Sequence, residues 1–234
     1  MKTKFSIVII SKNEEVYIAD AIKSASFADE VLVLDSGSID STCEIAESLG
    51  AKVFYQEWLG FGAQKNKAIS LATHDFVFVL DSDERITEKL QKEILSLLEN
   101  PRRDGYFVPR LNNFFGKDIK TCGLYPDYTL RFFNKNKAQF NEVPVHESVQ
   151  LKKNIGYLKN PIKHLAYESI DEFIEKQNRY STLHHNSSNR FKAVFNPYWT
   201  FFKLYVLKKG FMDGWDGFII SKLYAQYTFW KYIK

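Results

Sequence analysis

The sequence predicts an α/β protein with a mostly parallel central sheet, flanking helices, and amphipathic helices at the C-terminal end. Two observations lead to this prediction. Apolar runs rich in β-branched residues alternate with helical patterns through the first hundred residues, and residues 178–234 are basic, aromatic and helical in spacing. With 45% hydrophobic and 26% charged residues, the chain can bury a core, which excludes the disordered and fibrous classes.

Four strand–helix pairs are expected first. Each strand is a short, near-continuous apolar run, as is typical of a parallel sheet covered on both faces. The expected strands are 5–10, 30–34, 51–55 and 75–80, and the expected helices are 14–25, 39–49, 63–72 and 87–98. Ligands of such sheets gather at the carboxyl ends of the strands, so the residues that follow each strand are the candidates for a site.

The pattern changes after Pro101. Short strands are expected at 105–108, 130–133 and 143–146, with turn residues but no helices between them, and they would complete the sheet as mixed or antiparallel strands. Helical spacing returns from Ile170, and breaks in the helices are expected at Pro197 and over residues 210–217.

Charge divides the chain near Asn178. Residues 1–177 hold 23 basic and 26 acidic side chains, net −3, whereas residues 178–234 hold 9 basic and 2 acidic ones, net +7, with 16 of the 37 aromatic residues. Aromatic rings and lysines favour the headgroup region of an anionic membrane surface, so contact of residues 178–234 with such a membrane is the favoured interpretation. Packing on the sheet domain or on a second subunit, as a homo-oligomer, is the alternative.

Several other classes are disfavoured. The longest uncharged stretches, 180–189 and 193–202, are ten residues each, whereas a membrane-spanning helix needs about 20 apolar residues, so none is expected. The N-terminal segment is typical of a first strand rather than a signal peptide. Cys43 and Cys122 show no metal-type spacing and are expected to be reduced thiols of a cytoplasmic protein. No recognition motif accompanies the basic residues, which argues against nucleic acid.

Carboxylates follow two of the strands. Asp35 comes directly after the second strand and is placed to hydrogen-bond a ribose or a base edge, whereas Ser38 or Asp40 is expected to cap the next helix. The fourth strand ends in Asp81-Ser82-Asp83-Glu84. These carboxylates would repel one another unless a cation lay among them, and oxygen ligands favour Mg²⁺ or Mn²⁺. We therefore interpret Asp81 and Asp83 as metal ligands, whereas Glu84 is expected in a solvated turn, where Glu84 or Thr87 starts the next helix.

The motifs, taken in order, resemble family-2 glycosyltransferases with the A-type nucleotide-sugar fold. They are IISKNEE (9–15), LDSGSID (34–40) and the D-x-D motif 81–83; the segments WLGFGAQKN (58–66), RFFN (131–134) and VHE (145–147) are similar to the subgroup that includes the lipopolysaccharide core β-1,4-glucosyltransferases. Ser36 departs from many family members, which have a second aspartate there. The Q-x-x-R-W motif of processive synthases is absent, which argues for a single sugar addition.

The resemblance implies a nucleoside-diphosphate-sugar donor, usually UDP-linked, with UDP-glucose as the candidate here. It also implies attack by an acceptor hydroxyl with inversion at the anomeric carbon. It implies roles for nine residues. Asp83 would bind the divalent cation, with Asp81 as a second ligand or a ribose acceptor, and Glu147 would be the catalytic base. Asn13, Glu14 and Asp35 would hold the nucleoside; Lys65 would contact the base or the diphosphate, or be an exposed helix lysine; Asp127 and Arg131 would shape the acceptor side.

Two points stay open in this assignment. Arg131 is placed either to bind an acceptor phosphate or carboxylate or to form a structural ion pair, and His146 and His164 are expected to be structural. Residues 1–177 would form the nucleotide-sugar-binding and catalytic domain, and residues 178–234 the basic aromatic tail. The expected acceptor is a lipid-linked saccharide such as the lipopolysaccharide or lipooligosaccharide inner core, with the enzyme peripheral on the cytosolic face of a bacterial inner membrane. A sugar-nucleotidyltransferase and a catalytically silent membrane-associated scaffold are the rival functions.

Overall fold

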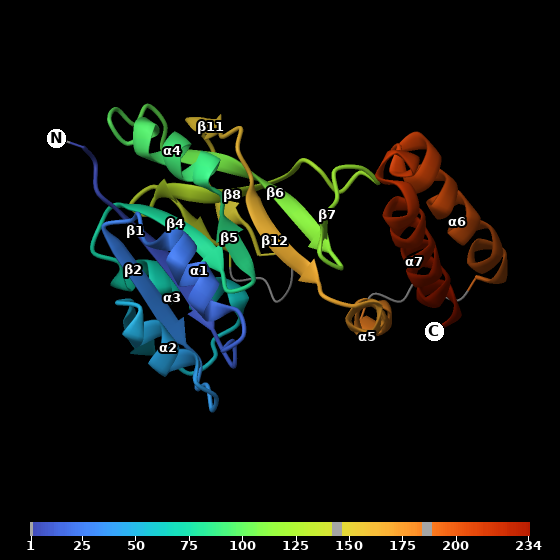
Figure 1. The fold of residues 1–234 in the computed structure, drawn as a ribbon, viewed down its shortest axis with the longest axis horizontal. Coiled ribbons are helices and arrows are strands. Elements are labelled where there is room, and N and C mark those ends of the chain that lie inside the picture. The colour runs from blue at the N-terminus through green and yellow to red at the C-terminus, as the bar shows by residue number, and fades with distance from the viewer. Residues whose placement is uncertain (1, 142–146, 184–188) are drawn as a thin grey trace. The chain divides into compact units, whose positions relative to one another are not determined.

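The computed structural model describes residues 2–141, 147–183 and 189–234. Its elements alternate between strand and helix at first and become purely helical at the end (Figure 1). In the first half they are β1 (Phe5–Ser11), α1 (Ile18–Ala25), β2 (Glu30–Asp35), α2 (Thr42–Ser48), β3 (Lys52–Tyr55), α3 (Phe61–Leu71), β4 (Phe76–Asp81), β5 (Glu84–Ile86) and α4 (Glu88–Leu97). The second half contains β6 (Gly105–Phe114), β7 (Lys117–Asp118), β8 (Asp127–Asn134), β9 (Gln139–Phe140), β10 (Val149–Gln150), β11 (Ile155–Tyr157), β12 (Ile162–Tyr167), α5 (Ile170–Leu183), α6 (Arg190–Phe202), the π-helix η1 (Lys203–Leu207), the 3-10 helix η2 (Gly210–Asp213) and α7 (Gly214–Ile233).

One mixed sheet of the described residues runs in the order β3-β2-β1-β4-β8-β6-β12-β5. Its first four strands are parallel, and β8 lies antiparallel to β4. The register sets Ser11 beside Asp35 and Ile10 beside Asp81, so the two carboxylates flank the end of β1 at the same edge of the sheet. The predicted fold class, a sheet with flanking helices, is confirmed.

Apolar side chains cover both faces of this sheet. One core cluster joins alternate residues of β1 and β4 to α1 and α4, and a second joins the opposite face to α3. The alternation follows from strand geometry, because successive side chains point to opposite faces. For example, Ile7 and Ile9 belong to the first cluster and Val8 to the second.

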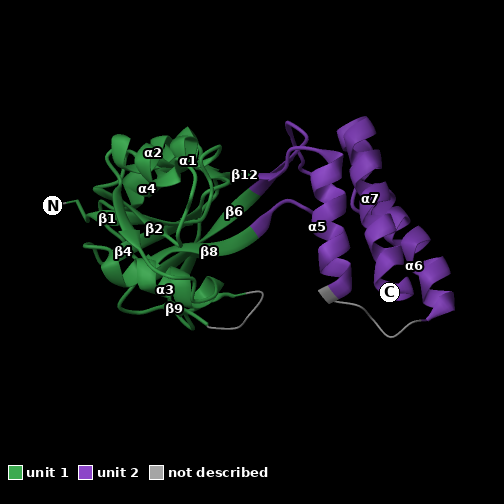
Figure 2. Ribbon diagram, turned by 90° about the horizontal axis from the view of Figure 1, so that it is seen from below, with its two compact units in different colours: residues 1–110, 128–164 green, residues 111–127, 165–234 purple. Residues whose placement is uncertain are grey.

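The chain forms two compact units (Figure 2). The first contains residues 1–110 and 128–164, and the second contains residues 111–127 and 165–234. A third core cluster, which includes Phe114, Ile119, Phe173 and Ile220, holds the second unit together. The charge boundary predicted at Asn178 lies inside α5, so it does not coincide with the division into compact units. Charge reports on surface chemistry, whereas compactness depends on which apolar side chains pack together.

Some element boundaries differ from expectation. The first helix begins at Ile18 rather than residue 14, because Asn13 has a left-handed backbone (φ 55°) and a turn joins the amide of Tyr17 to the carbonyl of Glu14. Pro197 lies inside α6 instead of ending it. A proline inside a helix removes one hydrogen bond, so packing of α6 on α7 must compensate. The strand predicted at 143–146 lies outside the described residues.

The C-terminal helices carry both apolar and charged side chains. Within the described ranges, no helix is both long and apolar enough to cross a membrane.

Candidate active site

The end of β4 turns back so sharply that Glu84 points inward. Glu84 begins β5, which pairs antiparallel with β12, and its side chain is fully buried. Its Oε2 accepts a hydrogen bond of 3.1 Å from the backbone amide of Asp81. The expectation of a solvated turn at Glu84 is therefore wrong, because pairing with β12 draws this residue into the sheet. Thr87, as predicted, starts the next helix: its side chain accepts a hydrogen bond from the Leu90 amide.

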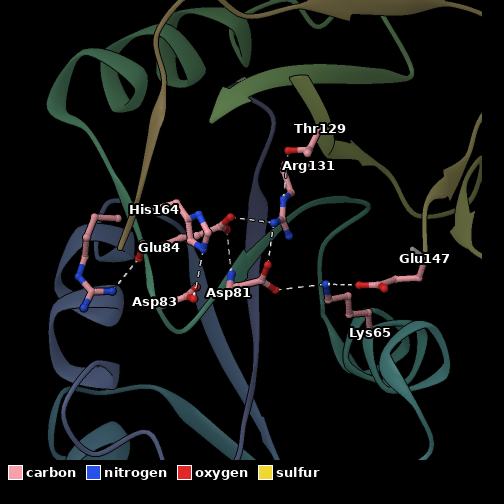
Figure 3. A network of polar contacts seen from close by, with 9 residues as sticks. Lys65, Asp81, Asp83, Glu84, Thr129, Arg131, Glu147 and His164 are labelled. Carbon is pink, nitrogen blue, oxygen red and sulfur yellow. Dashed lines mark hydrogen bonds and ion pairs between the residues drawn. The ribbon is translucent and has the colours of Figure 1, made fainter. Parts of the chain in front are cut away.

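Arg131 joins two of the carboxylates. It lies on β8, the strand beside β4, and its Nη2 is 2.6 Å from Oδ2 of Asp81 and 2.7 Å from Oε1 of Glu84 (Figure 3). The ion pair that was one alternative for Arg131 is present, and a contact with the acceptor stays a prediction. The guanidinium of Arg131 thus supplies at least part of the positive charge that offsets the repulsion among these carboxylates.

The charges in this cluster alter one another's titration. Burial alone would raise the pKa of Asp81, but Arg131 and Lys65 outweigh it and hold that pKa far below its usual range. Burial dominates at Glu84 and raises its pKa above the usual value. Burial would lower the pKa of Arg131, but the neighbouring carboxylates of Asp81 and Glu84 raise it. Asp81 therefore stays an anion throughout the physiological range, paired with a permanent cation.

Lys65 forms a second bridge in the same cluster. Its Nζ lies 2.8 Å from Oε1 of Glu147 and 3.2 Å from Oδ1 of Asp81 (Figure 3). Its side chain is only 6% exposed, and the ammonium also lies over the ring of Phe140 at 5.4 Å. The alternative of an exposed helix lysine is wrong, since Glu147 and the ring of Phe140 in β9 cover this side chain. The structure therefore brings the predicted base beside the predicted donor-side acid.

The two neighbours of Lys65 on α3 fix the surrounding chain. Gln64 is fully buried and donates to Oγ of Ser36 at 3.0 Å and to the carbonyl of Gln56 at 3.2 Å. Asn66 exchanges two hydrogen bonds with the backbone of Phe140, at 3.0 and 2.8 Å. Sequence reasoning missed both residues, although the run of four polar residues at 64–67 within a helix is a usable signal. The contact with Gln64 also gives Ser36, the departure from the family pattern, a structural partner.

Asp83 faces a different partner from Asp81. Its Oδ2 lies 3.3 Å from Nε2 of His164. Over the described ranges, no three His, Cys, Asp or Glu side chains gather into a metal-binding cluster. A Mg²⁺-type ion bound with substrate phosphates needs only one or two protein carboxylates, so Asp83, with His164 beside it, fits such an ion. Asp81 fits less well, because Lys65 and Arg131 engage both of its oxygens.

The loops after β1 and β2 are tied together. The backbone amide of Asn13 donates to Oγ of Ser38 at 2.8 Å, and Oδ1 of Asn13 accepts from the Ile39 amide at 2.9 Å. The amide of Glu14 donates to Thr42 at 2.7 Å, and burial raises the pKa of the Glu14 carboxyl even though Ser82 donates a hydrogen bond to it. Two predicted nucleoside-binding residues therefore lie in one joined rim at the carboxyl ends of β1 and β2.

Asp35 is buried within its own turn. Its Oδ2 accepts from the amides of Gly37 and Ser38 at 2.7 and 2.8 Å. Burial would raise its pKa, but the hydrogen bonds from Ser38 and Gly37 lower it overall. Asp40 accepts at 3.1 Å from the amide of Thr42, the first residue of α2, but the N-cap position itself is held by Ser41 rather than by Ser38 or Asp40. Asp35 shapes the loop, and any contact with a nucleoside stays a prediction.

Two further residues from the sequence analysis remain. Asp127 is the first residue of β8 and belongs to the second compact unit, so its acceptor-binding role stays a prediction. His146 lies outside the described residues.

Comparison with known proteins identifies the family. Residues 6–194 match the family model described as Glycosyl transferase family 2. The chain belongs to glycosyltransferase family 2. An uncharacterized glycosyltransferase of Rickettsia typhi is 33% identical over 251 residues, which cover 99% of this chain and 86% of that protein. The lipopolysaccharide core biosynthesis glycosyltransferase LpsC of Rhizobium meliloti is 28% identical over 243 residues, covering 97% of this chain and 90% of LpsC.

A solved glycosyltransferase shares the fold. The crystal structure of S. aureus TarS 1-349 in complex with UDP matches with a TM-score of 0.53 and 19% sequence identity, covering 91% of this chain and 75% of that chain. At this identity, the match concerns the fold alone. It agrees with the mixed sheet and flanking helices described above.

Proposed function

We propose that this family-2 glycosyltransferase moves one sugar from a nucleoside-diphosphate-sugar, UDP-linked, to a hydroxyl group of a lipid-anchored glycan, with inversion at the anomeric carbon. The observation that carries the proposal is the contact of Lys65 with both Asp81 and Glu147. It holds the carboxylate that we propose as the base beside the strand end at which α/β sheets bind nucleotides. The likeness to LpsC supports a lipid-anchored glycan as the acceptor. An acceptor of this class implies that the enzyme acts at the cytosolic face of a bacterial inner membrane.

In the proposed reaction, Glu147 accepts the proton of the acceptor hydroxyl while that oxygen attacks the anomeric carbon. The bond between this carbon and the diphosphate breaks, and the diphosphate leaves with the electron pair. Asn13 and Glu14 hold the nucleoside at the joined rim, and Asp81 keeps Lys65 and Arg131 in place. Lys65 also orients Glu147 through their 2.8 Å contact.

Asp83, with His164 beside it, is the residue proposed to hold a Mn²⁺ or Mg²⁺ ion. When bound, such an ion neutralises the charge that develops on the leaving diphosphate. Removal of divalent ions with a chelator should then abolish transfer, and Asp83→Asn should lose the response to added Mn²⁺.

The decisive variant is Glu147→Gln, with Glu99→Gln as the control because Glu99 is an exposed acid of the same unit. Transfer from a panel of UDP-sugars to purified lipooligosaccharide with a truncated core should fall roughly 10²- to 10⁴-fold in Glu147→Gln. Donor binding should persist, because a donor at 100 times its dissociation constant should still stabilise the variant by about 2.7 kcal/mol. Normal turnover in Glu147→Gln would refute the assignment.

The rival functions have their own readouts in the same assay. A sugar-nucleotidyltransferase would release pyrophosphate from a nucleoside triphosphate and a sugar phosphate, and a silent scaffold would bind UDP-sugars without hydrolysing or transferring them with or without Mn²⁺. Neither result is compatible with the proposed transfer.

A further inference from the structure

The outer face of α6 is apolar although it points to solvent. Five residues at helical spacing form this stripe, which we call the α6 face: Phe191, Val194, Phe195, Tyr198 and Phe202. At 3.6 residues per turn they share one side of the helix. Phe191 and Tyr198 are 79% and 74% exposed. A stripe of this kind normally faces a protein core, so its exposure calls for a partner.

The opposite side of α6 is already occupied by α7. Ala193 is buried, the hydroxyls of Thr200 and Thr228 lie 3.2 Å apart, and the ring of Phe201 meets that of Phe218 edge to face at 5.5 Å. The α6 face is therefore the side that remains after α6 has packed within the second unit (Figure 2).

A second apolar group follows α6 directly along the chain. This group, which we call the η corner, contains the exposed side chains of Val206, Leu207, Phe211, Met212 and Trp215. This corner packs closely against α7. The backbones approach so tightly that a Cβ added to Gly217 of α7 would lie 1.9 Å from the carbonyl oxygen of Gly210 in η2. Exposure of these side chains is thus a property of a packed corner rather than of a loose end.

The charge next to these apolar groups is positive. Lys192, Lys203, Lys208 and Lys209 are all exposed. Asp213 and Asp216 are the only acids of residues 189–234, and both are engaged elsewhere. Asp213 accepts from the hydroxyl of Thr121 at 2.7 Å, and Asp216 pairs with Lys117 at 2.5 Å. Lys117 neutralises Asp216, so the four exposed lysines outnumber the one acid charge, that of Asp213, left in their own segment.

We propose that the α6 face and the η corner dock the protein on an anionic lipid surface. Aromatic rings favour the headgroup region, lysines favour anionic lipid, and an amphipathic helix with both lies in the plane of the interface. A second copy of the chain is a poorer fit. A symmetric pair brings the same patch of both copies together, so their lysines would repel. The docking itself is independent of the proposed function. Only its purpose, which is to hold the enzyme beside a lipid-linked acceptor, rests on that function.

The test is co-sedimentation of the full chain with vesicles of phosphatidylcholine and phosphatidylglycerol, compared with phosphatidylcholine alone. We expect binding to the anionic vesicles, weakened by added salt. The double variants Phe191→Ser/Phe195→Ser and Lys208→Glu/Lys209→Glu should each lower the partition coefficient at least tenfold. The control Tyr55→Ser, which removes an exposed ring of the first unit, should bind as the unaltered protein does.

Several results would overturn the inference. They are absence of binding to anionic vesicles, binding that neither double variant weakens, and a dimer in sedimentation velocity that Phe191→Ser/Phe195→Ser converts to a monomer. UDP-sugar hydrolysis without vesicles is measured in parallel. Loss of membrane binding with hydrolysis retained separates the docking surface from the site, whereas membrane binding without hydrolysis or transfer would contradict the proposed function alone.

Discussion

Lys65 and Glu147 form an ion pair of 2.8 Å although they are 82 positions apart in the sequence. The same ammonium lies 3.2 Å from Asp81. One buried cation therefore joins the end of β4 to the chain that follows β9. Burying a charge is costly unless it is paired, so the position of each carboxylate depends on that of the lysine.

Replacing Lys65 with methionine should damage both stability and turnover. The change leaves Asp81 and Glu147 without this partner, which should cost about 3 kcal/mol in the free energy of unfolding. Transfer should fall roughly 100-fold even at temperatures at which the variant is folded, because Glu147 loses its orientation. Lys65→Arg keeps the charge and should lose less of both. Denaturant unfolding and initial rates measure the two effects, and a fully active Lys65→Met enzyme would contradict this role.

The pair of Arg131 and Glu84 is expected to show strong coupling. Arg131→Met leaves the fully buried Glu84 without its cation, which should cost about 3–5 kcal/mol. Adding Glu84→Gln removes the buried charge, so the double variant should be more stable than the sum of the single effects by about 1–3 kcal/mol. A double-mutant cycle in urea measures this coupling. Simple additivity would mean that the 2.7 Å contact contributes little.

Glu30 should make stability depend on acid pH. Burial alone would raise its pKa, but hydrogen bonds from Lys52, Ser6 and Thr73 lower it from 4.5 to about 2 in the folded protein. A carboxyl with a lowered folded pKa stabilises the protein above the unfolded value, and this contribution is lost as the pH falls from 4.5 towards 2.

Linkage with these two values gives a loss of roughly 2 kcal/mol from Glu30 between pH 7 and pH 3. Glu30→Gln should be less stable at pH 7 but should lose less stability over the same interval. Denaturation midpoints at the two pH values measure the difference. Parallel losses in both proteins would assign the acid sensitivity to other groups.

The sequence allowed the edge of the sheet that carries the site to be predicted. Strand β1 lies between β2 and β4, so residues that follow apolar runs in a parallel sheet must meet at one edge. Asp35 and Asp81 lie on either side of the end of β1, as that argument requires. The assignment of Thr87 as a helix start also needed only local information, since its side chain bonds within its own turn.

Contacts made by distant segments could not be predicted in this way. Glu84 has the sequence surroundings of a turn residue, and only its pairing with β12 buries it. Lys65 has the surroundings of an ordinary helix lysine until Glu147 and Phe140 cover it. The compact units were equally hidden, because residues 111–127 join the C-terminal helices through apolar packing rather than through charge.

The three consecutive side chains Gln64, Lys65 and Asn66 constrain how this enzyme can evolve. Each points about 100° away from the one before it, as helical geometry dictates, and each makes contacts in a different direction. A one-residue insertion or deletion within α3 ahead of them would rotate the whole trio and break all three sets of contacts together. Length variation among homologues should therefore avoid residues 61–66 and be tolerated instead in connections such as the turn at Gly50.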